Sequence, residues 1–191
     1  MEVRTFVLED ELHREAELLA HLRPNEWVCR SREGALARGL LREMLGERMG
    51  CAPSEITFEV APGGKPRLAG GEEIAFSLSH SRGLVAIALG ADPGARIGID
   101  VESADRRFDV DAFCEHVLHP AESARIRALP QVERQPALLR LLIAKEAYVK
   151  ALGCGFRLDP RDFDVDAVAV LREFEHKQGR SLWLGAVCLI E

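Results

Sequence analysis

The sequence lacks three features that would each place it in a distinct class of protein. No stretch approaches the roughly 18–20 consecutive apolar residues of a membrane span, and the first residues, MEVRTFVLEDELHREAELL, become acidic and amphipathic too soon for a signal peptide. Positive charge is not in excess, and the net charge of −6 over 191 residues argues against a broad nucleic-acid-binding surface. The five cysteines are odd in number and show neither CxxC nor Cys/His ligand spacing. We therefore expect a cytoplasmic protein with reduced thiols and no membrane or nucleic-acid partner.

Hydrophobic periodicity and turn residues predict a mixture of strands and helices. The expected strands cover residues 3–8, 56–60, 74–79, 84–89, 97–101, 162–170 and 183–190. The expected helices cover residues 9–22, 31–45, 109–118, 120–129 and 136–152, and Gly46 and Gly153 are expected to end two of them. Because strands and helices do not alternate strictly, the pattern favours the α+β class.

Two helical segments of the chain resemble each other. Residues 37–46 read ARGLLREMLG and residues 144–153 read AKEAYVKALG, and a strand of similar pattern follows each of them. This echo suggests a duplicated unit. We expect two similar α+β lobes, residues 1–94 and 95–191, related by a pseudo-twofold axis with the functional site in the cleft between them.

The residues with the most informative chemistry are acids and lysines in two short segments. Asp100 and Glu102 stand two apart on an expected strand, so their side chains share a face. Glu146 and Lys150 stand four apart on an expected helix and also share a face. Three converging carboxylates form a hard-oxygen site that suits Mg²⁺. Taken separately, the first pair also fits a solvated strand end and the second a plain surface ion pair.

Two further segments carry candidate phosphate-binding groups. Lys65 lies between a flexible glycine and a rigid proline, and it is a candidate phosphate contact or else a solvated lysine in a turn. Residues 76–81, FSLSHS, end a strand in hydroxyls and an imidazole. Ser79 and His80 could hold a phosphate through a neutral donor and a protonated ring. The alternative for His80 is a structural role.

In combination these segments resemble the Sfp-type 4′-phosphopantetheinyl transferase family. That family has, in order, the motifs GKP, F-N-x-S-H-S, G-I-D-x-E and W-x-x-K-E-A-x-x-K. This chain has, in the same order, Gly64-Lys65-Pro66, FSLSHS at 76–81, GIDVE at 98–102 and LIAKEAYVK at 142–150. Residues 118–122, LHPAE, also resemble the family's F-x-P-x-E stretch. The chain departs from the family pattern at Ser77, Leu118 and Leu142, where the family usually has Asn, Phe and Trp.

The resemblance implies an enzyme of the holo-[acyl-carrier-protein] synthase or 4′-phosphopantetheinyl transferase type. Such an enzyme moves the phosphopantetheine arm of coenzyme A to a serine of an apo acyl or peptidyl carrier protein and releases 3′,5′-ADP. The implied cofactor is Mg²⁺, or Mn²⁺ in its place, and the implied metal ligands are Asp100, Glu102 and Glu146. Glu146, directly or through a metal-bound water, or else Glu122 would act as general base, while Lys150 would contact the pyrophosphate. The residues implied to bind coenzyme A are Lys65, Ser79, His80, Lys145 and Arg42, with Arg38 as an alternative to Arg42.

Two other functions remain open at this point. A non-catalytic module that binds coenzyme A or a nucleotide would not need Asp100, Glu102, Glu146 and Lys150 together. A Mg²⁺-dependent pyrophosphate hydrolase would use the same residues but release phosphopantetheine to water. If two lobes complete one site within a single chain, the protein is expected to be a monomer. The pathway of the carrier protein is also open.

Overall fold

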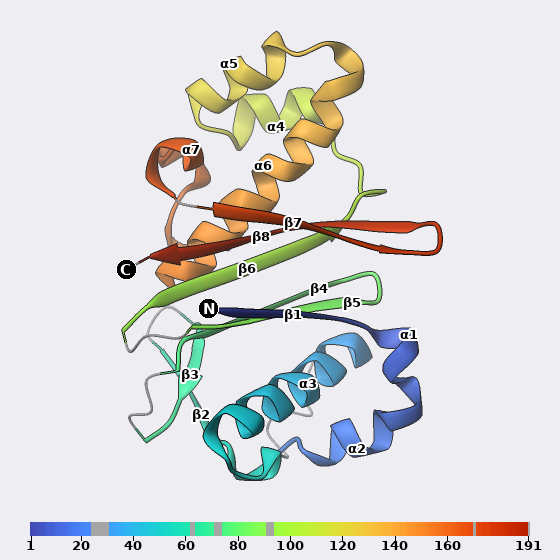
Figure 1. Cartoon of the computed structure of the whole chain (residues 1–191). Helices are drawn as coiled ribbons and strands as arrows, with labels where there is room; N and C mark the ends of the chain where they lie inside the picture. The colour runs from blue at the N-terminus through green and yellow to red at the C-terminus, as the bar shows by residue number, and fades with distance from the viewer. Residues whose placement is uncertain (24–30, 62–63, 71–73, 91–93, 170, 191) are drawn as a thin grey trace.

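A computed structural model describes residues 1–23, 31–61, 64–70, 74–90, 94–169 and 171–190 (Figure 1). The strands are β1 (Glu2–Val7), β2 (Phe58–Val60), β3 (Pro66–Leu68), β4 (Phe76–Ser81), β5 (Leu84–Leu89), β6 (Arg96–Ser103), β7 (Leu171–Gln178) and β8 (Ser181–Ile190). The helices are α1 (Leu8–Glu11), α2 (Glu15–Ala20), α3 (Arg32–Met49), α4 (Val110–His116), α5 (Pro120–Ala128), α6 (Gln131–Leu152) and α7 (Val165–Val168). The α+β class expected from the sequence is confirmed. Within the described ranges, no helix has both the length and the apolar character needed to cross a membrane.

The first sheet has the antiparallel order β1-β5-β4, and α3 covers one of its faces (Figure 1). The central strand β5 reads LVAIAL and is buried at every position. Its alternating side chains enter two different cores, because successive residues of a strand point to opposite faces. Val85, Ile87 and Leu89 pack with α3, whereas Leu84, Ala86 and Ala88 pack with the second sheet.

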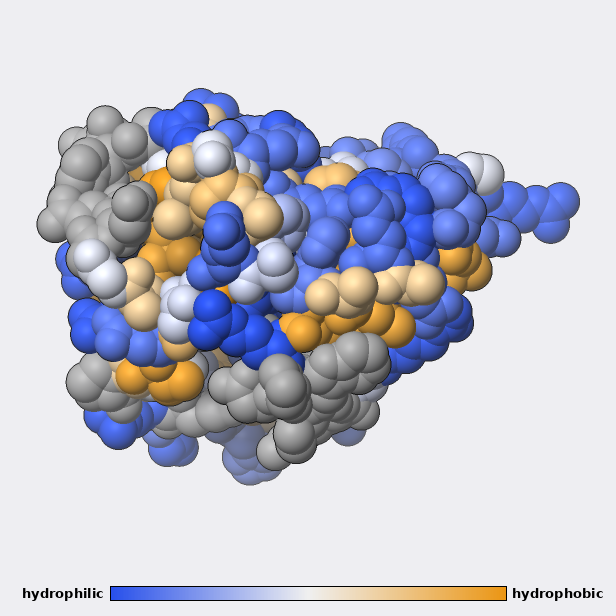
Figure 2. All heavy atoms as spheres, turned by 90° about the horizontal axis from the view of Figure 1, so that it is seen from below, coloured by the Kyte–Doolittle hydropathy of each residue, from blue (hydrophilic) through white to orange (hydrophobic). Residues whose placement is uncertain are grey.

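The outer side of this half is mainly polar. Seen from below the view of Figure 1, the surface is mostly hydrophilic, and hydrophobic side chains emerge in separate patches (Figure 2). This agrees with α3, whose buried positions form one stripe that includes Leu36, Leu40 and Met44 while Arg38 and Glu47 stay exposed.

The second sheet has the antiparallel order β6-β8-β7, and α6 crosses its outer face (Figure 1). The helix approaches β6 most closely at Gly98. A Cβ atom at that position would lie 1.9 Å from the carbonyl oxygen of Ala147 and 2.4 Å from the amide nitrogen of Ala151. Glycine at position 98 is therefore a condition for this packing. Helices α4, α5 and α7 pack around the remainder of α6.

The two sheets meet along β4 and β6, which run in the same direction and are joined through serine side chains. The backbone N–H groups of Ile99, Val101 and Ser103 donate to the hydroxyls of Ser77, Ser79 and Ser81 at 3.0, 3.4 and 3.4 Å, respectively. We call these three pairs the serine seam. Because the serines alternate along β4, all three hydroxyls face β6. The seam fixes the register of β6 against the first sheet.

The prediction of a strand over residues 162–170 is wrong. Residues 165–168 form α7, and the side chain of Asp164 accepts a hydrogen bond from the amide of Asp166 at its start. The alternating apolar residues of this segment imitate a strand, but an aspartate at the helix start offers the backbone a competing partner. The true strand, β7, is a polar edge strand, LREFEHKQ, in which only some side chains are partly buried.

Two helix boundaries also differ from the expectation. Helix α3 continues through Gly46 and ends at Gly50, whose φ of 69° is the left-handed conformation typical of a helix C-cap. The single helix expected over residues 9–22 is instead α1, a 3₁₀ turn at 12–14 and α2. Gly153, with a φ of 69°, ends α6 as expected.

The lobe boundary stays a prediction. The expected boundary between residues 94 and 95 directly follows residues 91–93, which lie outside the described ranges. Each three-stranded sheet does carry one long helix, but the pseudo-twofold relation between the two halves also stays a prediction.

Gly98→Ala should destabilise the protein severely, because the added methyl group meets the α6 backbone rather than a movable side chain. We expect a loss at or above the roughly 1–3 kcal/mol typical of overpacking. Urea unfolding followed by circular dichroism measures this loss. Gly34→Ala is the matched control, because its Cβ would meet no atom closer than 3.3 Å. Equal stability of the two variants would contradict the close approach.

Candidate active site

A cavity of about 890 Å³ lies where β4, β6 and α6 come together. Its lining combines three kinds of side chain. The carboxylates are Asp100, Glu102 and Glu146, and the cations include Arg38, Lys65, Arg106 and Lys150. The apolar lining includes Phe108, Phe113, Val117, Leu139, Leu142 and Ile143. The sequence-predicted acids are thus brought into one cavity together with groups that sequence reasoning did not identify.

Asp100 is the more buried of the two acids on β6. Its Oδ1 accepts hydrogen bonds from the hydroxyl of Ser79 and from Nζ of Lys150, both at 2.8 Å. Its side chain is 10% exposed and that of Lys150 is 31% exposed, so the ion pair is screened only in part by water. Ser79 is therefore engaged by a carboxylate of its own chain, in addition to its place in the serine seam.

Glu102 lies on the same face of β6 and is also held through both oxygens. Its Oε2 accepts a hydrogen bond from the hydroxyl of Ser81 at 2.6 Å, and its Oε1 pairs with the guanidinium of Arg106. That guanidinium lies over the ring of Phe108, 4.9 Å from the ring centre. Neither Arg106 nor Phe108 was among the candidates, because no motif or periodicity singles out a residue in the irregular segment after a strand.

Glu146 faces this pair of acids from α6, and its pKa is raised. Removal from water is the largest cause, and the negative charge of Asp100 adds to it, while Lys150 and Arg106 act in the opposite direction. The residue is accessible to solvent at the cavity, yet the surrounding protein still disfavours its charge. The raised pKa therefore reflects mainly removal from water, with a smaller contribution from the charge of Asp100.

The three carboxylates form an all-oxygen donor set that fits a hard divalent cation. A cation beside them would offset the repulsion that raises the pKa of Glu146. However, Asp100, Glu102 and Glu146 are not at chelating distance, since they do not form a group whose ligand atoms lie within 4.8 Å of one another. Cation binding would require side-chain movement.

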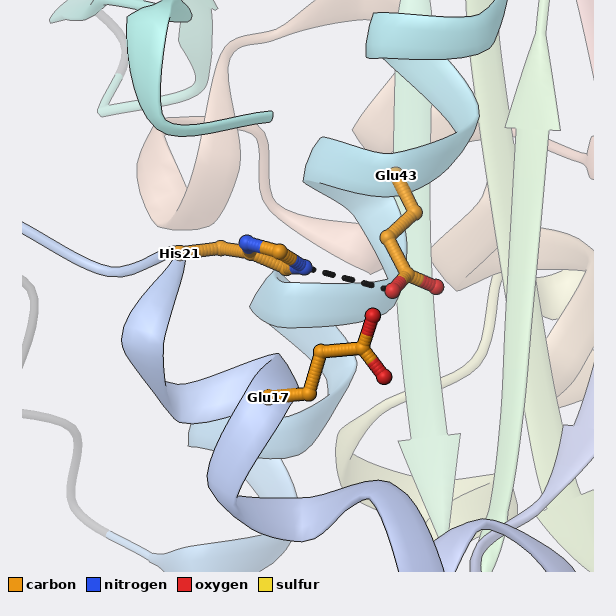
Figure 3. Close-up of side chains that lie close together, drawn as sticks. All are labelled: Glu17, His21 and Glu43. Atoms are coloured by element: carbon orange, nitrogen blue, oxygen red, sulfur yellow. Dashed lines mark hydrogen bonds and ion pairs between the residues drawn. The ribbon is translucent and has the colours of Figure 1, made fainter. Parts of the chain in front are cut away.

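One group in the described ranges does reach that spacing, and it lies elsewhere (Figure 3). Glu17, His21 and Glu43 come together between α2 and α3, with His21 Nε2 at 3.3 Å from Glu43 Oε1. The guanidinium of Arg14 pairs with both glutamates. A cation of the chain itself thus already occupies the cluster, so the structure favours an ion-pair network over a metal site.

Glu122 and Lys145 form a buried ion pair away from solvent, with side chains 0% and 4% exposed. Lys145 Nζ donates to both oxygens of Glu122, at 2.8 and 2.7 Å, and to the carbonyl of Phe163. Glu122 also accepts from the amides of His119 and Val165. The pair joins α5, α6 and the segment before α7. These contacts favour a structural role, and the predicted roles in catalysis and coenzyme A binding stay predictions.

Lys65 lines the cavity but is tied to backbone carbonyls. Its Nζ donates to the carbonyl of Lys150 at 2.8 Å and to that of Ile97. Burial, and then the nearby charge of Lys150, lowers its pKa to about 8. The lysine thus connects the segment before β3 to β6 and to the end of α6. A phosphate would have to compete with the two carbonyls for its ammonium group.

Two other candidates for coenzyme A binding lie apart from the cavity acids. His80 follows Ser79 on β4 and so points toward α3, where its Nδ1 lies 3.5 Å from Oε2 of Glu33. Arg42 is fully buried and donates to the carbonyls of Pro53 and Ile56, both at 2.8 Å. These contacts favour a structural role for Arg42, and its predicted contact with coenzyme A stays a prediction.

The structure shows what surrounds each of the three residues that depart from the family pattern. Ser77 is the first member of the serine seam. Leu118 is buried in the core that α4, α5 and α6 share, and Leu142 packs against that core while lining the cavity. Ser77 and Leu142 therefore both line the cavity that a ligand would occupy, and Leu118 does not.

Comparison with known proteins agrees with the motifs. Residues 96–184 match the family model described as the 4′-phosphopantetheinyl transferase superfamily. The chain is 35% identical to the 4′-phosphopantetheinyl transferase HetI of Nostoc sp. over 123 residues, which cover 62% of this chain and 50% of the relative. It is 32% identical to the L-aminoadipate-semialdehyde dehydrogenase-phosphopantetheinyl transferase of Eremothecium gossypii over 170 residues, which cover 85% and 62%. A 4′-phosphopantetheinyl transferase of Bacillus subtilis is 27% identical over 126 residues, which cover 66% and 54%. The chain thus spans between 50% and 62% of the length of these relatives.

Glu122→Gln should lower the free energy of unfolding by about 3–5 kcal/mol, because it leaves the ammonium of Lys145 buried without its charge partner. Urea denaturation measures the change. Glu115→Gln is the matched control, since Glu115 is 69% exposed and should shift stability by no more than about 0.5 kcal/mol. Wild-type stability of the Glu122 variant would contradict the structural role.

The raised pKa of Glu146 should be visible in the metal-free protein. Carbon-13 NMR of the side-chain carboxyl should give a midpoint above the value of about 4.3 usual for glutamate. Asp100→Asn should lower that midpoint, because removing a negative charge makes loss of the Glu146 proton easier. Divalent-cation affinity should accordingly fall as the pH drops through the midpoint. A midpoint unmoved by Asp100→Asn would show that the two carboxylates do not interact.

Proposed function

We propose that the protein transfers the 4′-phosphopantetheine moiety of coenzyme A to a serine of an apo carrier protein, and the match of residues 96–184 to the 4′-phosphopantetheinyl transferase superfamily supports this. In this reaction the serine oxygen bonds to the β-phosphorus of the coenzyme A pyrophosphate. The bond from that phosphorus to the bridging oxygen breaks, and 3′,5′-ADP leaves. The serine proton passes to a base.

The observation that carries the proposal is the grouping of Asp100, Glu102, Glu146 and Lys150 around one cavity. Phosphoryl transfer requires stabilisation of negative charge on the phosphoryl oxygens and acceptance of one proton. A Mg²⁺ ion held by the three carboxylates would supply charge neutralisation at the pyrophosphate. A protein that only binds coenzyme A has no need for both this donor set and an adjacent lysine.

Glu146 is the proposed proton acceptor. A general base works best when its pKa lies closer to the working pH, and the raised pKa of Glu146 moves it in that direction. It is accessible to solvent, so an incoming serine can approach it. Glu122 lacks this access, because its carboxylate is enclosed by Lys145 and two backbone amides.

Lys150 is the proposed pyrophosphate contact. Its ammonium group lies at the cavity, 2.8 Å from Asp100, and is partly exposed. It can therefore turn from the carboxylate to an arriving phosphate without leaving the site. The apolar lining, which includes Phe108 and Leu142, offers an uncharged surface to the pantetheine arm.

Mass spectrometry of a panel of apo carrier proteins tests the proposal. Incubation with the protein, coenzyme A and Mg²⁺ should add the mass of one phosphopantetheine group to a carrier serine, and EDTA should prevent it. Glu146→Gln should slow transfer by about 10²–10⁴-fold, the usual contribution of a general base. Glu133→Gln, an exposed residue at the start of the same helix, should keep the wild-type rate.

Two results would contradict the proposal. Cleavage of coenzyme A without labelling of any carrier would indicate a Mg²⁺-dependent hydrolase. Binding of coenzyme A without cleavage or transfer across the panel would indicate a binding module.

A further inference from the structure

Arg106 is the one cavity cation paired to Glu102, and neither the motifs nor the comparisons give it a role. Its backbone is fixed: its amide donates to the carbonyl of Ser103 at 3.0 Å, and its own carbonyl accepts from Nε2 of Gln135 at 3.2 Å. Its side chain is 47% exposed and is held by Glu102 and by the ring of Phe108. A fixed backbone with an exposed guanidinium allows the side chain to change partner without moving the chain.

The pairing places Arg106 in direct competition with a divalent cation. Both oxygens of Glu102 are occupied, one by the guanidinium and the other by the hydroxyl of Ser81. A cation that uses Glu102 as a ligand shares the carboxylate with the guanidinium, and the two positive charges then repel each other and compete for it. An ion pair this exposed is weak, so a divalent ion bound by several carboxylates can displace it.

The displaced guanidinium would remain at the cavity, because Arg106 lines it and Phe108 beside it lines it too. A planar guanidinium binds the oxygens of a phosphate through two parallel hydrogen bonds, as it does a carboxylate. The anionic group nearest to the carboxylates in the proposed reaction is the pyrophosphate of coenzyme A. Its arrival brings negative charge to the place where the guanidinium has lost its partner.

We propose that Arg106 is a positioning residue that exchanges partners. It holds Glu102 while the cavity is empty, and it moves to a phosphate oxygen of the substrate when a divalent cation takes Glu102. This inference rests on the proposed function only for the identity of the phosphate ligand. Arg106 would then couple the binding of the cation to the binding of the substrate.

The test measures binding to the full chain without a carrier protein. In Arg106→Gln, Mn²⁺ alone, followed by electron paramagnetic resonance, should bind several-fold tighter than in the wild type, because its competitor at Glu102 is gone. Coenzyme A, titrated calorimetrically in the presence of Mg²⁺, should bind about tenfold weaker, because a charged phosphate contact is lost. Each ligand should also enhance binding of the other less in this variant than in the wild type.

Arg107→Gln is the matched control. Arg107 is the next residue and is also exposed, but its guanidinium donates to backbone carbonyls, those of Ala104 and Arg106. It should change neither affinity. Arg106→Lys keeps the charge but not the paired geometry, so it should restore the wild-type Mn²⁺ affinity while recovering coenzyme A binding only in part.

Weaker or unchanged Mn²⁺ binding by Arg106→Gln would overturn the proposal, as would unchanged coenzyme A binding. Equal effects of the Arg106 and Arg107 variants would show a general charge effect and would also overturn it. These readouts do not depend on transfer. Failure of the wild type to modify any carrier would contradict the proposed function and leave the cation competition measurable.

Discussion

The site depends on strand β6, which buries apolar side chains on one face and carries charged side chains on the other. Ile97, Ile99 and Val101 of β6 enter the core between the sheets, while Asp100 and Glu102 on the opposite face carry charges that are costly to bury. The serines of β4 meet this demand. Ser79 donates to Asp100 and accepts from the amide of Val101, so a single hydroxyl satisfies both the charge and the backbone. Ser81 does the same for Glu102 and Ser103.

Helix α6, which completes the site, can pack closely on β6 because Gly98 has no side chain. Because Gly98 has no Cβ, α6 lies directly on β6 at Ala147 and Ala151, and the residues before each of these, Glu146 and Lys150, line the cavity with the acids. Both Lys145 and Glu146 line the cavity, but the ammonium of Lys145 turns into the interior to pair with Glu122, whereas Glu146 stays exposed to solvent. The adjacent lysine and glutamate of one motif therefore serve different purposes, one holding the helices together and the other remaining available to a ligand.

The sequence predicted the face shared by Asp100 and Glu102, because strand periodicity depends only on local geometry. It predicted the class of the fold and the end of α6 at Gly153 for the same reason. It could not predict that Lys145 pairs with Glu122, since the partner lies 23 residues away and burial is a property of the assembled core. The burial of Arg42 could not be predicted from the sequence for the same reason. The strand predicted over residues 162–170 was wrong for a local reason. Alternating apolar residues fit a strand, but the N-cap residue Asp164 stabilises a helix at this place.

The charged side chains that line the cavity are only partly paired with one another, and this arrangement suits the binding of a further ion. Three carboxylates line the cavity, and two cations, Lys150 and Arg106, pair directly with two of them. Within the described ranges Glu146, the remaining carboxylate, forms no such ion pair, and its pKa is raised first by burial and then by the charge of Asp100. Burial of like charges this close is tolerable only while water and mobile cations reach them. A cavity that keeps its acids apart and partly balanced by its own lysine and arginine can remain folded without a bound ion. In the proposed function, the same carboxylates would hold a metal ion once the ion and an anionic substrate arrive.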